Sequence, residues 1–191
     1  MNKVKLGPRT LVYPMPVFII GTVVDGKPNF MTVAWSGICD GEPPMIEIAI
    51  RPSRHTLKGI DQNQTFSVNI PSVKQVKEAD FCGIESGDKV DKVAVCKFKL
   101  FYGKLTSAPL IEQCPVNLEC KVVQRLTLGS HVVFVGQIEE VHVSGDCLTD
   151  GKPDARKIQP LIFTPEPSSG YYALGDFVAK PFKCGLELRK K

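Results

Sequence analysis

An Asp-Gly pair between two strand-like runs is the feature of this sequence that most restricts its fold. Residues 17–24 read VFIIGTVV and residues 29–35 read NFMTVAW, and both runs are rich in β-branched and aromatic side chains. Asp25-Gly26 lies between them. Glycine accepts the positive φ that a tight hairpin turn requires, so this pair between such runs is a strong hairpin signal. The sequence therefore predicts a β-hairpin over residues 17–35.

Further runs of the same kind follow along the chain. We predict strands at residues 45–50, 65–71, 116–126, 131–143 and 161–163. In the run 131–143 the apolar side chains fall on both faces, because Val133 and Val135 alternate with Phe134 and Ile138. A strand that is apolar on both faces is typical of a sheet covered on both sides. This run therefore predicts a buried strand in a closed sheet.

The predicted helices are short and few. Apolar residues at helical spacing mark residues 54–61, residues 73–79 and a short segment after Pro153, and the tail from residue 171 onward is irregular in pattern. Alternating β-α-β units need longer helices between the strands, so a parallel sheet is disfavoured. We expect one domain over residues 1–191, mainly β, folded as an antiparallel barrel with short peripheral helices. The segment 83–92 is rich in glycine and charge and is expected at the surface.

Composition and charge narrow the classes of partner. The 191 residues are 43% hydrophobic and 23% charged, as in a globular domain, and the net charge of +4 comes from scattered Lys and Arg mixed with acidic residues. A nucleic-acid partner is not expected, because such proteins usually carry a basic stripe. Seven cysteines, none in a two-residue-gap motif, favour free thiols and a reducing compartment. With no apolar stretch near the ~20 residues that span a bilayer, the expected location is cytoplasmic, without membrane attachment.

The best local signal for an anion site is the segment Arg51-Pro52-Ser53-Arg54-His55-Thr56, where a strand ends and a helix begins. The start of a helix offers unpaired N–H groups and a partial positive charge. We expect Ser53 to cap this helix. The two arginines and the hydroxyl groups of Ser53 and Thr56 suit a phosphate, with His55 beside them. The alternative is an ordinary capped helix with a solvated basic turn.

A second candidate is the strand end Thr32-Val33-Ala34-Trp35, which carries the only tryptophan. Small residues there allow a flat ring to approach the backbone, and Trp35 can pack against it. The alternative is that Trp35 belongs to the core or an interface. His131 follows a glycine-containing turn and faces either the core or a ligand. The three histidines show no metal-ligand spacing, so neither a metal site nor a catalytic side chain is predicted.

Familiar nucleotide and hydrolase motifs are missing from the sequence. Residues 83–89 read GIESGDK, which is one residue short of a phosphate loop and has no Ser or Thr after the lysine. There is no Gly-x-Gly-x-x-Gly fingerprint for a dinucleotide and no Gly-x-Ser-x-Gly elbow for a hydrolase. These patterns give no support to a Rossmann domain or a serine hydrolase.

Taken together, several segments resemble the flavin reductase-like family of FMN-binding split barrels, and within it the flavoredoxin branch. Their order and spacing cover nearly the whole chain. The segments are residues 7–17 (GPRTLVYPMPV), 26–39 (GKPNFMTVAWSGIC), 76–92 (VKEADFCGIESGDKVDK), 118–121 (LECK) and 171–175 (YYALG).

The resemblance implies a split β-barrel with Greek-key connections that forms a homodimer and binds FMN without a covalent bond at the dimer interface. It places the isoalloxazine edge against Thr32 to Trp35 and the phosphate in the segment Arg51 to Thr56. Lys92 is implied as a further phosphate contact. His131 and Tyr171 or Tyr172 are implied as weaker candidates for lining the pocket.

Three functional hypotheses remain open from the sequence. The first is a reductase that oxidises NAD(P)H, and the second is a carrier that exchanges electrons with a small electron-transfer protein. In both, the cofactor carries the redox chemistry and no side chain need act as acid or base. The third is a barrel without a cofactor that acts through protein interactions, because fold does not fix function.

Overall fold

The hairpin predicted from Asp25-Gly26 is present in the computed structural model, which describes residues 2–189. Strand β2 (Phe18–Val24) pairs antiparallel with β3 (Lys27–Val33), and Val24 lies opposite Lys27. Asp25 and Gly26 have φ values of 48° and 80°. Two positive φ values in a two-residue turn match the right-handed twist of the strands that it joins.

A seven-stranded antiparallel sheet contains this hairpin, in the order β3-β2-β6-β9-β10-β5-β4. The other strands are β4 (Ser36–Gly41), β5 (Pro44–Ile50), β6 (Thr65–Ile70), β9 (Val116–Leu128) and β10 (His131–Val143). The fold is therefore mainly β and antiparallel, as expected. However, β3 and β4 remain edge strands and do not pair with each other. The expected antiparallel barrel is therefore split along this seam, where the two edge strands leave the sheet unpaired.

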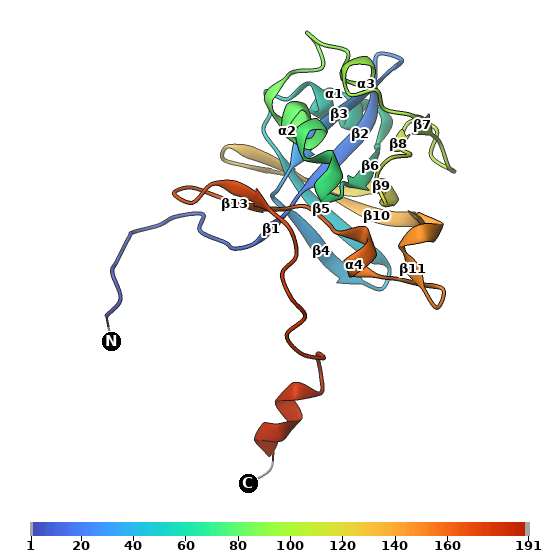
Figure 1. Cartoon of the computed structure of the whole chain (residues 1–191). Coiled ribbons are helices and arrows are strands. Elements are labelled where there is room, and N and C mark those ends of the chain that lie inside the picture. Colours follow the sequence, from blue (N-terminus) through green and yellow to red (C-terminus); the bar gives the residue numbers. More distant parts are fainter. Residues whose placement is uncertain (1, 190–191) are drawn as a thin grey trace.

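Short elements surround the sheet. Three smaller sheets contain β1 (Met15–Pro16) with β13 (Ile162–Thr164) and β14 (Gly170–Tyr172), β7 (Leu100–Phe101) with β8 (Leu110–Ile111), and β11 (Leu148–Thr149) with β12 (Lys152–Pro153). The helices are α1 (His55–Asn63), η1 (Val73–Gln75), α2 (Val76–Ile84), α3 (Lys92–Val95), α4 (Ala155–Ile158), η2 (Gly145–Cys147) and η3 (Cys184–Arg189). Figure 1 shows α1, α2 and α3 gathered at one end of the sheet, over β2 and β3.

Apolar side chains form two clusters. One fills the inside of the sheet around Phe66 and Phe134, and the other lies under α2 around Phe30. Strand β10 buries Phe134 and Gly136 on one face but leaves Val133 and Val135 on the other face only half-buried. The prediction that both faces are fully covered is therefore wrong for this strand. Gly136 is required by packing, because an added Cβ would lie 2.5 Å from the Phe66 ring.

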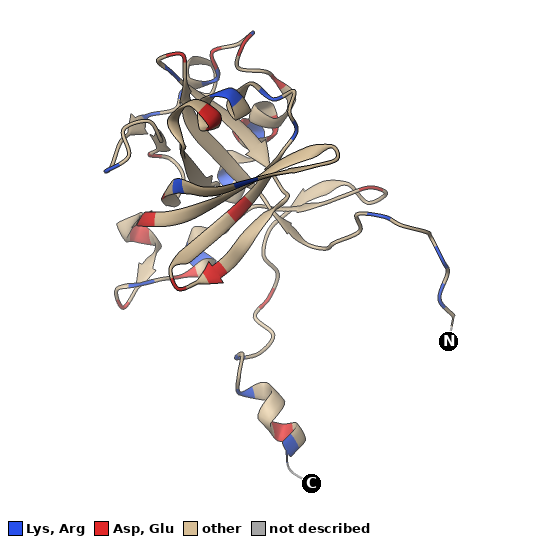
Figure 2. Cartoon of the chain, turned by 180° about the vertical axis from the view of Figure 1, so that it is seen from behind, with Lys and Arg blue, Asp and Glu red and all other residues tan. Residues whose placement is uncertain are grey.

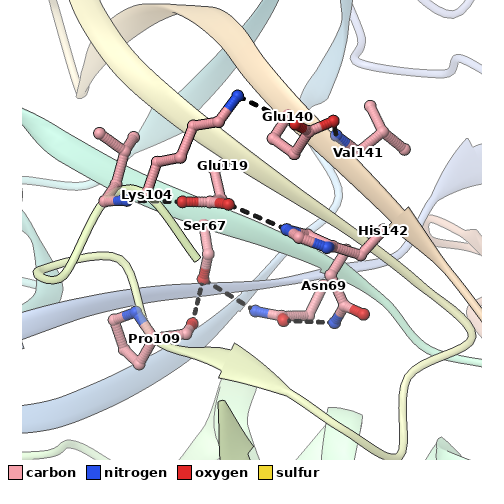
Figure 3. Close-up of polar contacts among 10 residues, drawn as sticks. Ser67, Asn69, Lys104, Pro109, Glu119, Glu140, Val141 and His142 are labelled. Carbon is pink, nitrogen blue, oxygen red and sulfur yellow. Dashed lines mark hydrogen bonds and ion pairs between the residues drawn. The ribbon is translucent and has the colours of Figure 1, made fainter. Parts of the chain in front are cut away.

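A buried polar network fastens the loop before β8 onto the sheet (Figure 3). The fully buried carboxylate of Glu119 accepts hydrogen bonds from the Leu105 backbone N–H at 2.6 Å and lies 2.9 Å from His142 Nε2. Nearby, the hydroxyl of Ser67 donates to the Pro109 carbonyl. The backbone between β7 and β8 is thereby tied to β6 and β9 by side chains.

Both ends of the described chain leave the sheet as extended arms (Figure 1). They carry exposed apolar side chains, namely Val4, Leu6, Val12, Phe177, Val178, Phe182 and Leu188. The tail expected to be irregular contains β14 and η3, and its residues 190 and 191 lie outside the described part. Among residues 2–189 no helix has the length and apolar character needed to cross a bilayer.

Candidate functional site

A cavity of about 400 Å³ opens at the seam where the sheet fails to close. Ala34 and Trp35 form the link between the two edge strands, so the chain crosses the seam beside the cavity. The lining residues are Met31, Thr32, Val33, Ala34, Trp35, Ala49, Arg51, Arg54, His131 and Phe163. Seven residues that the sequence singled out therefore meet here, and one of them, His131, lies more than 70 positions after the others in the sequence.

One side of the cavity is flat and aromatic. The Trp35 and His131 rings lie against each other, with centroids 4.6 Å apart and planes 31° apart, and Trp35 remains 40% exposed. The Ala49 N–H donates to the Trp35 carbonyl at 2.9 Å and fixes the backbone there. Burial, and then the charge of Arg51, lower the pKa of His131, which favours the neutral form of the ring that lies against Trp35.

The other side of the cavity is basic. Arg51 follows β5, and Arg54 is the N-cap of α1, in extended conformation with φ −81° and ψ 128°. The first turn of α1 contains no acidic residue, so nothing there opposes the positive end of the helix dipole. Two guanidinium groups beside a nine-residue helix start give this end of the cavity a preference for an anion.

The expected cap by Ser53 is wrong. The Arg54 N–H donates to the Arg51 carbonyl at 3.0 Å, and this turn makes Arg54 the last extended residue before the helix. No side chain caps α1, and Ser53 is exposed. Ser53, His55 and Thr56 do not line the cavity, although they belong to the same strand-to-helix turn.

Thr56 anchors this turn through a residue that the sequence reasoning did not select as a site. Asn29 Nδ2 donates to Thr56 Oγ1 at 2.7 Å, and both side chains are buried. Gly87 packs so closely against Asn29 that an added Cβ would overlap its side-chain oxygen and lie 3.4 Å from the His55 ring. The signal available in the sequence was an asparagine inside a strand, a position where that residue is uncommon.

The sequence predicted Lys92 in a surface loop, and this prediction is wrong. Its side chain is 4% exposed, and Nζ donates to the carbonyls of Phe30 at 2.8 Å and Cys82 at 2.9 Å. Burial lowers the pKa of this ammonium group. Lys92 lies outside the first cavity and lines a neighbouring one of about 370 Å³ together with Asn29 and Gly87. It joins α3 to β3 and α2.

Within the strand end 32–35, the Thr32 and Val33 side chains make contacts away from the cavity. The hydroxyl of Thr32 donates to the Ala79 carbonyl on α2, and Val33 packs into the first core cluster. Both side chains therefore hold the strand in place. Ala34 leaves the backbone accessible to a flat ligand because its side chain is small.

Tyr171 lies in a second cavity, of about 250 Å³, that shares Thr32, Ala34 and Phe163 with the first. Its hydroxyl donates to Asp80 Oδ1 at 3.0 Å. Burial, followed by this contact, raises the pKa of Tyr171 to about 12. Tyr172 is 51% exposed and lines neither cavity.

Comparisons with known proteins identify the fold and the family. The chain matches a flavoredoxin structure from Methanosarcina acetivorans at 39% identity, covering 98% of this chain and 100% of that one, with a TM-score of 0.93. It matches the flavoredoxin structure of Desulfovibrio vulgaris (Miyazaki F) at 40% identity, covering 96% and 100%, with a TM-score of 0.90. A curated relative from Acinetobacter baylyi, named FMN reductase (NADH) RutF, is 29% identical over 64% of this chain and 63% of its own length.

The family model described as the flavin reductase like domain matches residues 9–166, which include the seam and every lining residue of the first cavity. This match agrees with the open antiparallel sheet. The chain belongs to the flavin reductase-like family.

Proposed function

We propose that this flavin-dependent redox protein binds FMN in the cavity at the seam and transfers electrons through it. The observation that carries the proposal is the pairing, within one cavity, of an aromatic, small-residue side with a basic side at a helix start. FMN has the same two parts, a flat ring and a phosphate. A cavity of about 400 Å³ also lies in the usual size range of cofactor sites.

Each part of the cavity has a definite role in this proposal. Arg51 and Arg54 hold the phosphate at the start of α1. His55 and Thr56 shape that helix start from outside the cavity, and Lys92 supports the neighbouring wall through the Phe30 and Cys82 carbonyls. The backbone from Thr32 to Trp35 lies along the ring edge, and Trp35 and His131 exclude water from one side. When bound, FMN supplies the redox chemistry, and the chain binds it, orients it and sets its surroundings.

Binding of FMN is tested with a pair of matched double variants. Each arginine contact to a phosphate contributes about 1.5–3 kcal/mol, so Arg51→Ala/Arg54→Ala should raise the Kd for FMN by about 100-fold or more. Lys74→Ala/Lys77→Ala removes the same charge from exposed positions outside the cavity and should leave the Kd unchanged. Equal Kd values for both double variants, measured by quenching of FMN fluorescence, would contradict the assignment.

The electron donor divides the proposal into two forms. In the first, the protein is a reductase that oxidises NADH or NADPH, the activity named for the Acinetobacter relative. In the second, it is a carrier that exchanges electrons only with a small electron-transfer protein, which the flavoredoxin structures favour through their higher identity and coverage. Anaerobic stopped-flow mixing with NADH and NADPH separates them. Rapid bleaching of the flavin absorbance supports the reductase, and unchanged absorbance over buffer controls excludes it.

We further propose that two copies of the chain form a homodimer around the seam. The support is the pair of extended arms, whose apolar side chains are exposed in the single chain although water is an unfavourable surrounding for them. Acidic and basic residues are interspersed along the elements drawn in Figure 2. Sedimentation equilibrium of the full chain tests the dimer, and a monomer at micromolar concentration would overturn it.

A further inference from the structure

Three thiols gather in the second core cluster, apart from the cavity. Cys82 is on α2, Cys96 ends α3, and Cys114 follows β8. Cys82 and Cys114 are buried in the cluster, and Cys96 is half-buried against it. Lys92 links the two residues, because its ammonium group donates to the Cys82 carbonyl at 2.9 Å and its carbonyl accepts from the Cys96 N–H at 3.0 Å. Each thiol also affects the pKa of the other. These two sulfur atoms are therefore neighbours in the folded chain, although 14 positions separate them.

Two charged side chains flank this thiol pair. Glu78 on α2 has a buried carboxylate oxygen, Oε2, without a hydrogen-bond partner in the described chain, and its charge disfavours both thiolates. The Lys92 ammonium group favours both thiolates. Burial is the largest influence and raises the pKa of Cys82 to about 12 and that of Cys96 by less. Both thiols are therefore protonated near neutral pH.

We propose that Cys82 and Cys96 are an oxidation site, and that hydrogen peroxide converts them into an intramolecular disulfide. Cys96 reacts first because solvent reaches it more readily than the buried Cys82. Its thiolate attacks one peroxide oxygen and breaks the O–O bond, which gives a sulfenic acid and a hydroxide. The hydroxide takes the proton that the thiol released and becomes water.

The second step closes the disulfide. The Cys82 sulfur attacks the Cys96 sulfur, the S–S bond forms, and the S–O bond breaks. The leaving hydroxide takes the Cys82 proton as a second water, so two thiols are oxidised while one peroxide is reduced to two waters. Because the reacting species is the thiolate, the reaction should be slow at neutral pH and accelerate as the pH rises toward the pKa of Cys96.

The bond would join the two ends of the segment between α2 and α3. That segment contains Gly87, which packs on Asn29, and Lys92, which donates to the Cys82 carbonyl. Oxidation should therefore restrain the wall beside the start of α1. The proposal does not depend on flavin binding, because neither Cys82 nor Cys96 lines the cavity at the seam.

The experiment uses the full chain in a Cys39→Ser/Cys184→Ser background, which removes the two exposed thiols. The protein is treated with hydrogen peroxide at mildly alkaline pH, the remaining thiols are alkylated, and peptides are mapped by mass spectrometry without reduction. The expected result is a peptide linked through Cys82 and Cys96, with Cys114 alkylated only after unfolding. Amide hydrogen exchange of residues 85–91 should slow in the oxidised protein.

Cys96→Ser in the same background should abolish the linked peptide, and Cys147→Ser, at a buried thiol outside this cluster, should leave it intact. If Cys96→Ser fails to fold, Cys96→Ala makes the same test with a purely apolar side chain. Recovery of Cys82 as a free thiol, with Cys96 either alkylated or oxidised only to the sulfinic acid, would overturn the proposal. So would linkage of Cys82 to Cys114 instead.

Discussion

The buried thiols make a quantitative prediction for stability in alkaline solution, tested with the protein kept fully reduced. Burial raises the pKa of Cys120, on β9 beside Gly136 and Phe66, far above its ordinary value of 9.0. The folded chain therefore keeps this proton at a pH where the unfolded chain has lost it. A raised folded-state pKa contributes stability that is complete below the unfolded-state pKa and is lost as pH increases above it.

The magnitude follows from this difference in proton binding. At about pH 10, one unit above the unfolded-state value, a thiol that stays protonated in the folded state lowers the free energy of unfolding by about 1.4 kcal/mol. Cys114 behaves in the same way, and so does Cys82, whose pKa is about 12. Together the three thiols lower stability by about 4 kcal/mol at this pH. The lowered pKa of Lys92 acts in the opposite direction and offsets part of this loss.

A single variant isolates one thiol from these other groups. The free energies of unfolding of the wild type and Cys120→Ala are measured by urea titration near pH 8 and near pH 10 in the presence of a reductant. Cys120→Ala should have a lower free energy of unfolding than the wild type near pH 8 because it loses packing. Near pH 10 this difference between variant and wild type should be smaller by about 1.4 kcal/mol. Cys184→Ala, on the exposed tail, should show no such change. A deficit for Cys120→Ala that is the same at both pH values would refute the reasoning.

Three further substitutions test the packing and the buried charges. Gly136→Ala should lower stability by about 1–3 kcal/mol because its Cβ overlaps the Phe66 ring, and an unchanged urea midpoint would contradict this. Lys92→Met should lower the free energy of unfolding by about 2–4 kcal/mol because two carbonyls lose their donor. Because burial lowers the pKa of Lys92, this loss of stability relative to the wild type should grow as the pH rises toward 10.5. Lys89→Met, at an exposed position, is the control. Glu119→Leu should lower stability by about 1–3 kcal/mol by leaving the Leu105 N–H without its acceptor, whereas Glu112→Leu, at an exposed position, should have little effect in thermal unfolding.

Local patterns in the sequence predicted most of the strands. The alternation of apolar residues and the Asp25-Gly26 turn depend on neighbours in the chain, and the hairpin is present with its expected turn. Whether β3 and β4 pair is encoded by no local pattern, and in the described chain they remain unpaired edge strands. The helix after β5 begins at His55 rather than one residue earlier, because a backbone turn and not a side-chain cap sets its start.

The candidate site was predictable where it is built from continuous segments. Thr32 to Trp35 and the two arginines were found because a strand end and a helix start each have a recognisable composition. Lys92 was misplaced because glycines and charges around it suggested solvent, whereas two carbonyls from distant elements surround its ammonium group. Asn29 was not selected because its partners, Thr56 and Gly87, lie on other segments and their contact depends on the folded arrangement.

The open seam explains why a cavity forms at this place in the sheet. If β3 and β4 paired, their backbone N–H and C=O groups would hydrogen-bond to each other, and side chains would fill the interior of the closed sheet. Instead the two-residue link Ala34-Trp35 carries the chain from one edge strand to the other and leaves room between them. The strand β5, which pairs with β4, then ends at the turn that bears Arg51 and Arg54. The same break in pairing therefore leaves a backbone edge beside the cavity and brings the basic helix start next to it, so a single feature of the topology supplies both parts of the site that we propose for FMN.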